Sequence, residues 1–220
     1  MLGGPTWPQR RLWVWQLLFP FVRAGGMALF PMRLDGGERV PRSGPYIVVA
    51  NHIDWKDPPA IELQVRVAIR FMAKAEAFEL PFVGGLLRGI GCFPVRRGQA
   101  DRHALETCLE VLRAGRPLGF FPEGTRSRDG RLHRAHPGIA FLARRSGAPL
   151  LPVAILGTQG ARPLRSDIRV RIGEPFRSSE LDVGETADEQ AIADAIMRRV
   201  ALLLPEELRG EYASAELRGH

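Results

Sequence analysis

Past residue 35, short apolar segments alternate along the chain with longer segments in which apolar residues recur at helical spacing. The short segments predict strands over 47–50, 69–73, 93–95, 118–121, 150–156 and 168–172. The longer segments predict helices over 58–67, 100–114 and 138–146, and a last helix that begins near residue 186. Because strands alternate with helices, the pattern predicts an α/β domain with a mixed, largely parallel central sheet flanked by helices.

The two ends of the chain differ from this regular middle part. Near the C-terminal end, Thr186 and Glu189 have the spacing of a capping box, and Pro205 follows the last predicted helix. The residues after Glu206 are polar, and we expect them to be loose. The expected organisation is an N-terminal apolar element over 1–34, an α/β domain over 35–208 and a polar tail over 209–220.

The N-terminal element contains the apolar run Leu12–Val22, with Arg10 and Arg11 before it and Arg23 after it. The run is shorter than the roughly 20 apolar residues that a bilayer-spanning helix needs. A signal peptide is one alternative, although a cleavage site of small residues is missing. A helix packed on the core of the domain is another. The tryptophans and phenylalanines between flanking arginines favour a helical element that lies in the membrane interface.

The composition fits one folded domain with an anionic partner. The chain has 220 residues, of which 45% are hydrophobic and 25% are charged, which is enough for one sizeable core. The net charge of +7 favours nucleic acid, a phospholipid surface or a phosphorylated substrate without choosing among them. Cys92 and Cys108 lie far apart in apolar runs. They form no disulfide framework or metal pattern, which favours a reducing, intracellular setting.

The first candidate site follows the predicted strand 47–50, where residues 51–57 read NHIDWKD. A neutral imidazole is a natural base near pH 7, and a carboxylate on its second nitrogen fixes the tautomer. His52 and Asp57 are the candidate pair, and Asp54 competes for the carboxylate role. Asp57 could instead cap the following helix, and His52 could be a buried histidine. Since no nucleophile motif accompanies the pair, we expect it to activate a hydroxyl of a substrate.

The second candidate site follows the predicted strand 118–121, where residues 121–127 read FPEGTRS. Gly124 allows close approach of the backbone to a ligand, and Arg126 offers a planar, charged fork for phosphate. A solvated surface turn is the alternative. Ligands of open α/β sheets bind beyond the carboxyl ends of the strands, so the two turns are expected to meet in one site.

Four short blocks together resemble the motifs of the glycerolipid acyltransferase family in order and spacing. They are NHIDWKD over 51–57, GCFPVR over 91–96, FPEGTRS over 121–127 and LPV over 151–153. The similar region covers about residues 35–175. Within the family, the chain resembles the bacterial 1-acyl-sn-glycerol-3-phosphate acyltransferases.

The resemblance implies a role for each matching residue. His52 would be the general base that takes the proton from the sn-2 hydroxyl of lysophosphatidic acid, and Asp57 would orient it. The acyl donor would be a thioester of CoA or of acyl carrier protein, and the product would be phosphatidic acid. The phosphate-binding residues would be Lys74, Arg96, Glu123, Gly124, Thr125 and Arg126. The resemblance implies no metal or other cofactor, and it implies a peripheral or monotopic place on the cytoplasmic face of the cell membrane.

The sequence departs from the family pattern at two positions. Asp54 stands where the family commonly has a small hydroxyl residue, and Pro94 lies inside the second block. An acyltransferase for another lyso-lipid or polar-lipid hydroxyl, and a non-catalytic anionic-lipid-binding protein, are alternative functions. A nucleic-acid binder is disfavoured, because no recognition motif is present. His133 and His136 are expected to be solvated loop residues, since further metal ligands are not evident nearby.

Overall fold

The computed structural model describes residues 12–89, 91–95, 102–184 and 186–213, and the structural statements below concern these residues. Its strands are β1 (Met32–Asp35), β2 (Ile47–Ala50), β3 (Arg70–Lys74), β4 (Phe93–Val95), β5 (Leu118–Phe120), β6 (Leu150–Leu156) and β7 (Ile168–Ile172). Its α-helices are α1 (Leu12–Leu29), α2 (Asp57–Val65), α3 (Val83–Gly89), α4 (Arg102–Arg113), α5 (Gly138–Ser146) and α6 (Glu189–Ala201).

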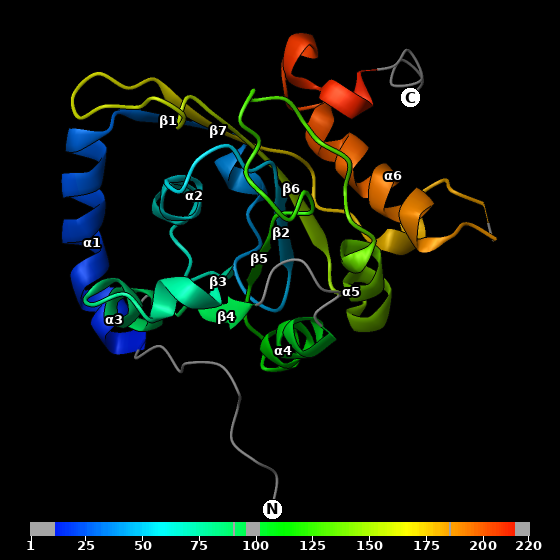
Figure 1. Ribbon diagram of the computed structural model, residues 1–220, viewed down its shortest axis with the longest axis horizontal. Helices are drawn as coiled ribbons and strands as arrows, with labels where there is room; N and C mark the ends of the chain where they lie inside the picture. Colours follow the sequence, from blue (N-terminus) through cyan, green and yellow to red (C-terminus); the bar gives the residue numbers. More distant parts are fainter. Residues whose placement is uncertain (1–11, 90, 96–101, 185, 214–220) are drawn as a thin grey trace, which may run out of the picture.

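The strands form one sheet in the order β1-β7-β6-β2-β5-β3-β4. β6 and β7 are antiparallel, and every other neighbouring pair is parallel. Helices lie on both sides of the sheet (Figure 1), with α2 against one face and α4, α5 and α6 against the other. The predicted α/β class with a mixed, largely parallel sheet is therefore confirmed.

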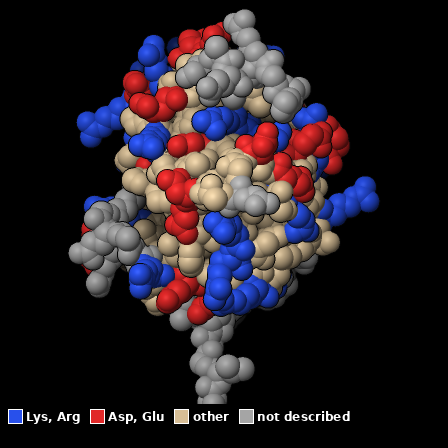
Figure 2. Space-filling view, turned by 90° about the vertical axis from the view of Figure 1, so that its right-hand side faces the viewer, with Lys and Arg blue, Asp and Glu red and all other residues tan. Residues whose placement is uncertain are grey.

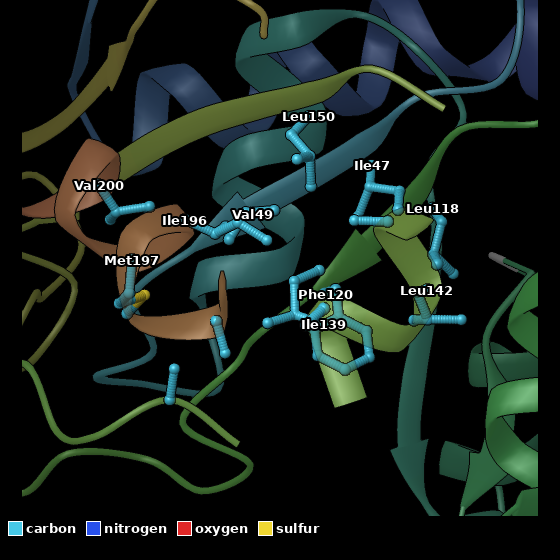
Figure 3. Packing of buried hydrophobic residues seen from close by; sticks show 14 of the residues in the cluster. Ile47, Val49, Leu118, Phe120, Ile139, Leu142, Leu150, Ile196, Met197 and Val200 are labelled. Atoms are coloured by element: carbon cyan, nitrogen blue, oxygen red, sulfur yellow. The ribbon is translucent and has the colours of Figure 1, made fainter. Parts of the chain in front are cut away.

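β2 lies in the middle of the sheet and divides its side chains between two hydrophobic clusters. Ile47 and Val49 belong to the cluster formed with α4, α5 and α6, whereas Val48 and Ala50 belong to the cluster formed with α2. Figure 3 shows side chains of β2, β5 and β6 meeting those of α5 and α6. This alternation follows from the two-residue period of a strand. Because both faces are covered, the strand reads as a continuous apolar run.

Most predicted elements agree with the structure to within two residues. The strands over 93–95, 150–156 and 168–172 and the helix over 138–146 agree residue for residue. β1 was not predicted. It has the sequence MRLD and lies at the edge of the sheet, and its side chains alternate between half-buried and exposed. A strand with so little buried surface gives a weak hydrophobic signal, and it crosses the expected boundary at residue 34.

The predicted capping box at the start of the last helix was wrong. The N-cap of α6 is Asp188, whose carboxylate accepts a hydrogen bond from the backbone N–H of Ala191 at 2.7 Å. The helix itself begins at Glu189. Aspartate is as good an N-cap as threonine, so the cap next to the helix supplies the bond and Thr186 lies before it.

The expectation of a loose C-terminal segment after Glu206 was wrong for residues 207–213, and residues 214–220 lie outside the described residues. Residues 206–213 form two short 3-10 turns, and Tyr212 is buried in the hydrophobic cluster that includes residues of α5 and α6. Its hydroxyl donates to Asp194 Oδ1 at 2.9 Å and accepts from the backbone N–H of Ala135 at 2.8 Å. Together with backbone hydrogen bonds from Leu132 to Leu208 and from Glu211 to Leu132, this side chain holds a polar segment in place, which composition alone does not reveal.

The N-terminal apolar run lies in α1, which contacts the domain through one side. Arg23 Nε donates to the carbonyl oxygen of Leu63 in α2 at 3.0 Å, and the Leu63 side chain packs against Gly26. Other apolar side chains of α1 are exposed, namely Leu17, Phe21, Val22 and Leu29. Among the helices of the described ranges, none combines the length and the hydropathy that crossing a bilayer requires.

The charged residues of one face can be followed in Figure 2, which looks onto the side where α5 and α6 lie. Basic and acidic residues are interspersed over this face, with a group of basic residues below its centre. The net charge of +7 is therefore not expressed here as a surface of one sign.

Candidate active site

Three neighbouring strands, β6, β2 and β5, run parallel and end at one edge of the sheet. The loops that follow them contain residues 51–56, 121–137 and 157–160. The backbone N–H of Ser127 donates to the carbonyl oxygen of His52 at 2.7 Å, which joins the first two loops. The two turns singled out in the sequence therefore lie together, at the edge where open α/β sheets bind ligands.

His52 and Asp57 form a direct pair where these loops meet, and this part of the site is called the His52–Asp57 corner. His52 Nδ1 lies 2.8 Å from Asp57 Oδ2, and the two side chains are 8% and 0% exposed. Asp57 is the first residue of α2, and Lys56 occupies the N-cap position, so the carboxylate turns back toward the preceding loop. A proton on Nδ1 donated to the carboxylate leaves the lone pair on Nε2 of the imidazole.

The Asp57 carboxylate is held by three further donors. Its Oδ2 also accepts from the backbone N–H groups of Ile53 at 2.7 Å and Asp54 at 2.8 Å. Its Oδ1 accepts from the hydroxyl of Thr158 at 2.5 Å. A buried carboxylate is tolerated when hydrogen bonds replace its hydration, and four donors meet that condition here. The pair is thus fixed in orientation before any substrate arrives.

Asp54, the competing carboxylate, has a different partner. Its Oδ1 lies 2.6 Å from Nζ of Lys56 and accepts from the backbone N–H of Lys56 at 3.0 Å. The Lys56 ammonium also lies 5.2 Å from the ring centroid of Trp55, which is 68% exposed. The negative charge of Asp54, which departs from the family pattern, is therefore balanced by Lys56. Asp57 is the carboxylate that reaches the imidazole.

Glu123 faces inward and connects two loops. Its Oε1 accepts from the backbone N–H of His52 and its Oε2 from the backbone N–H of His133, both at 2.9 Å. Burial raises the pKa of Glu123 to about 7, and the two N–H donors oppose this shift. Since a carboxylate repels phosphate and both oxygens are engaged, the geometry favours a role in holding the backbone of His52 over direct contact with a phosphate.

Two further residues of the second loop shape the surroundings of His52. The Phe121 ring stacks on the His52 imidazole, with 4.1 Å between the ring centroids. Gly124 has φ of +66°, and a Cβ at this position would lie 2.9 Å from Cδ2 of His136. Both the left-handed backbone and the close neighbour favour glycine, so the turn after β5 depends on the absence of a side chain there.

A polar pocket of about 220 Å³ lies beside the pair. It is lined by Ile53, Thr125, Arg126, Ser127, Arg128 and Gln159. Arg126 and Arg128 are exposed, so two guanidinium groups are available at an open surface site. Such groups bind phosphate through paired, charge-assisted hydrogen bonds. The predicted residues Thr125 and Arg126 are therefore brought together with the His52 loop.

Two other predicted phosphate ligands are placed differently. Lys74 ends β3, its side chain is 54% exposed, and its Nζ lies 3.4 Å from Oε1 of Glu76. It does not line the described pocket. Arg96 lies outside the described residues. Both assignments stay predictions.

The structure offers no cysteine nucleophile in the described part of the chain. Cys92 and Cys108 are both buried with free thiols. Burial raises the pKa of the Cys108 thiol, which disfavours the reactive thiolate. Neither cysteine is therefore placed as a nucleophile, and the role of His52 as a base on a substrate hydroxyl stays a prediction.

The sequence reasoning missed the loop after β6, which reads GTQG over 157–160. Thr158 bonds to Asp57, and Gln159 lines the pocket and donates from Nε2 to the carbonyl oxygen of Arg128 at 2.8 Å. It also missed that the side chain of Asn51 clamps Ile155 of β6, accepting from its N–H and donating to its carbonyl oxygen. A polar pair between glycines directly after a buried strand was a usable signal.

Comparison with known proteins shows the family of this chain. Residues 32–156 match the family model described as Acyltransferase. The chain belongs to the acyltransferase family, and the resemblance to glycerolipid acyltransferases read from the four blocks is confirmed.

Several named relatives are similar over much of the chain. The 1-acyl-sn-glycerol-3-phosphate acyltransferase of Bacillus subtilis is 32% identical over 65% of this chain and 72% of its own length. The chloroplastic enzyme LPAT1 of Arabidopsis thaliana is 30% identical over 79% of this chain and 49% of its own length. The chain thus spans about half the length of the chloroplastic relatives. The lyso-ornithine lipid O-acyltransferase of Pseudomonas aeruginosa is 35% identical over 78% of this chain and 74% of its own length.

A solved structure has the same architecture. The crystal structure of the 1-acyl-sn-glycerophosphate acyltransferase PlsC from Thermotoga maritima matches with a TM-score of 0.67 and 27% identity, over 88% of this chain and 79% of that one. The mixed sheet with flanking helices is therefore shared with an acyltransferase whose sequence is clearly related.

Proposed function

We propose that this chain transfers a fatty acyl group from an acyl thioester to the sn-2 hydroxyl of lysophosphatidic acid, giving phosphatidic acid. The donor is acyl-CoA or acyl carrier protein. The observation that carries the proposal is the buried His52–Asp57 pair, joined at 2.8 Å beside a pocket with two arginines. The names of the Bacillus and Arabidopsis relatives support the choice of acceptor.

The geometry supports a mechanism in which His52 is the base. Its Nε2 takes the proton of the acceptor hydroxyl while Nδ1–H remains bonded to Asp57. The acceptor oxygen attacks the thioester carbonyl carbon, a C–O bond forms, and the carbonyl electrons move to oxygen. When the tetrahedral intermediate collapses, the C–S bond breaks and the imidazolium returns the proton to the leaving thiolate. A positioned base contributes about 10²–10⁴-fold, and orientation and charge stabilisation supply the rest.

Arg126 is the proposed phosphate ligand of the acceptor. It lines the pocket beside the His52 loop, together with Ile53, Thr125 and Ser127. A phosphate held there would keep the sn-2 hydroxyl of the acceptor within reach of the His52 loop. Glu123 and Gly124 are proposed to support this pocket by fixing the backbone of the loop after β5. Lys74, at the end of β3, and Arg96, which follows β4 in the sequence, are proposed to contact the phosphate.

A second candidate acceptor is a lyso-ornithine lipid. It is favoured by one observation, the 35% identity to an enzyme of that name over most of both chains. The chemistry at His52 would be the same, because this acceptor also presents a hydroxyl. The pocket lined by Arg126 and Arg128, called the arginine pocket below, would then bind an amino-acid headgroup in place of a phosphate. Comparing the two acceptors in one assay therefore decides between them.

We also propose that the protein works on the cytoplasmic face of a membrane as a peripheral or monotopic protein. The support is the exposed apolar side of α1, where Phe21 is 73% exposed and Leu17 is 60% exposed. Aromatic and aliphatic side chains of this kind are stable in the membrane interface. Because β1 begins at Met32, a chain that starts after Leu29 removes α1 and leaves the sheet complete. It should sediment less with anionic vesicles than the full chain, and equal sedimentation would place the attachment elsewhere.

The function is tested by measuring thiol release from acyl-CoA and from acyl carrier protein on vesicles. Lysophosphatidic acid, lyso-ornithine lipid or no acceptor is supplied, and the lipid product is identified by mass. We expect release that depends on lysophosphatidic acid, and a loss of about 10²–10⁴-fold in His52→Ala. His103→Ala, which removes an exposed histidine of α4, is the matched control and should keep full activity. Full activity in His52→Ala would exclude His52 as the base, and no transfer with any pair would favour a lipid-binding function.

A further inference from the structure

We propose that Thr158 is a positioning residue for the His52 base and acts through Asp57. This inference rests on the proposed function, because it assumes that His52 removes a proton. Thr158 lies in none of the four sequence blocks that carry the family resemblance. Its side chain is fully buried, and its hydroxyl donates to Oδ1 of Asp57 at 2.5 Å.

The first argument is the division of donors over the two carboxylate oxygens. Oδ2 of Asp57 accepts from His52 Nδ1 and from the backbone N–H groups of Ile53 and Asp54. These three donors all come from the loop after β2. The bond from Thr158 reaches the other oxygen from a different strand end. A carboxylate held at both oxygens cannot rotate about its Cβ–Cγ bond without breaking a hydrogen bond, so Thr158 fixes the plane in which Oδ2 faces the imidazole.

The second argument is that the position of Thr158 is itself rigid. Gly157, which precedes it, has φ of +76°, and a Cβ there would lie 2.3 Å from the carbonyl oxygen of Asp167. The turn after β6 therefore requires glycine. The side chain of Asn51 bonds to both backbone groups of Ile155 and ties the end of β6 to the start of the His52 loop. Thr158 is thus presented to Asp57 from a fixed neighbour.

Removal of the hydroxyl has a predictable consequence. Thr158→Val keeps the branched shape and leaves Oδ1 of the buried carboxylate without this donor. The carboxylate can then rotate, and the share of His52 with its proton on Nδ1 falls. We expect kcat to fall by about 10–100-fold, a part of the 10²–10⁴-fold that a positioned base supplies. KM for the acceptor should change by less than about threefold, because Thr158 does not line the arginine pocket.

The experiment compares three variants of the full chain on vesicles. Thr158→Ser retains a hydroxyl and should restore most of kcat, whereas Thr158→Val should not. Thr107→Val is the matched control, since Thr107 is also buried and donates its hydroxyl to the carbonyl oxygen of His103 at 2.9 Å, far along the chain in α4. It should keep kcat. An unchanged kcat in Thr158→Val, or an equal loss in Thr158→Val and Thr158→Ser, would overturn the proposal.

A second measurement does not require turnover. The ¹⁵N chemical shifts of the imidazole nitrogens report which nitrogen carries the proton, and the signals of His52 are identified by their absence in His52→Ala. Thr158→Val should reduce the share of the tautomer with the proton on Nδ1, whereas Thr158→Ser and Thr107→Val should not. If the wild-type chain shows no acyl transfer, the proposed function fails, and this spectrum still decides the positioning role. Identical His52 shifts in wild type and Thr158→Val would reject it.

Discussion

The His52–Asp57 corner and the arginine pocket lie side by side but are built in opposite ways. Asp57 is completely buried and accepts four hydrogen bonds, two of them from backbone N–H groups. Arg126 and Arg128, in contrast, are exposed on a pocket open to solvent. The corner is therefore fixed by the protein, whereas the two arginines of the pocket are exposed to solvent.

The difference matches what the proposed function requires of each region. A base must be held in one tautomer and one orientation, because a small displacement reduces proton transfer. A recognition pocket for a headgroup must admit a charged ligand from the membrane surface and release the product. Exposed guanidinium groups stay hydrated in the free protein, so leaving them unpaired costs little free energy. They gain charge-assisted hydrogen bonds when a phosphate binds. Substitutions in the corner should therefore affect kcat, and those in the pocket should affect KM.

The largest effect is expected for Asp57→Asn. The neutral amide cannot stabilise the imidazolium. Its NH₂ group is a donor, whereas the carboxylate accepts hydrogen bonds from the backbone N–H groups of Ile53 and Asp54. We expect kcat to fall by about 10²–10⁴-fold with little change in KM, measured by acceptor-dependent thiol release. Asp54→Asn, which weakens only the contact with Lys56, is the control and should lose less than about threefold. A greater loss in Asp54→Asn would mean that the wrong carboxylate has been assigned.

A smaller effect, on binding, is expected for Arg126→Ala. The loss of charge-assisted hydrogen bonds to a phosphate should raise KM for lysophosphatidic acid by about 10–100-fold and leave kcat nearly unchanged. For an acceptor without phosphate, KM should change little. Arg131→Ala removes the same charge from an exposed position outside the pocket and should have little effect on either acceptor. Equal losses with both acceptors in Arg126→Ala would remove the phosphate role.

The last prediction concerns stability and not activity, and it uses the pH dependence of Glu123, which holds the backbone of His52. Burial raises the pKa of Glu123 from 4.5 to about 7 in the folded protein. Between these values the native state keeps a proton that the unfolded state has released, so this carboxyl lowers the free energy of unfolding as pH rises. The free energy of unfolding of the wild type relative to Glu123→Gln should fall by up to about 1.4 kcal/mol per pH unit across this window and level off above it. Urea denaturation at pH 5, 6, 7 and 8 measures it.

Asp129 provides the control for this experiment. It accepts hydrogen bonds from the Ser127 hydroxyl, the backbone N–H of Arg131 and His133, which together lower its pKa to about 2. Its stabilising effect is lost only as pH falls through that low value. Asp129→Asn should therefore give a curve parallel to the wild type between pH 5 and 8. Parallel curves for Glu123→Gln and the wild type would show that Glu123 does not titrate in this window.

The strands that form both regions were predictable because the sheet is covered on both faces. Each buried strand then reads as an apolar run, and β6 and β7 agreed with the prediction at every residue. The weak signals belonged to elements with little buried apolar surface. β1 carries two charged residues in four, and the turn containing Tyr212 is held by a few contacts with residues far away in the sequence. Periodicity cannot detect an element that a few distant contacts or an edge position hold in place.

The candidate residues themselves were readable in part. His52, Asp57 and Arg126 stood out because polar residues followed buried strands, and the structure brings their loops together. The inward direction of the Glu123 carboxylate was not readable, since the same EGTR string would suit a surface turn. Thr158 was missed for a related reason: its partner lies 101 positions away in the sequence.

The sequence alone determined the class of fold, the order of most elements and the chemical groups of the site, because these depend on local apolar patterns and on short segments that follow strands. Only the tertiary structure decided that Asp57 and not Asp54 pairs with His52. It also decided that Glu123 bonds to the backbone of His52, and that Thr158 of the loop after β6 donates to the Asp57 carboxylate. The first outcome depends on the path of one loop, and the other two depend on the order of strands in the sheet. Neighbouring strands bring together loops that are far apart in sequence, and burial then requires every polar atom between them to find a partner.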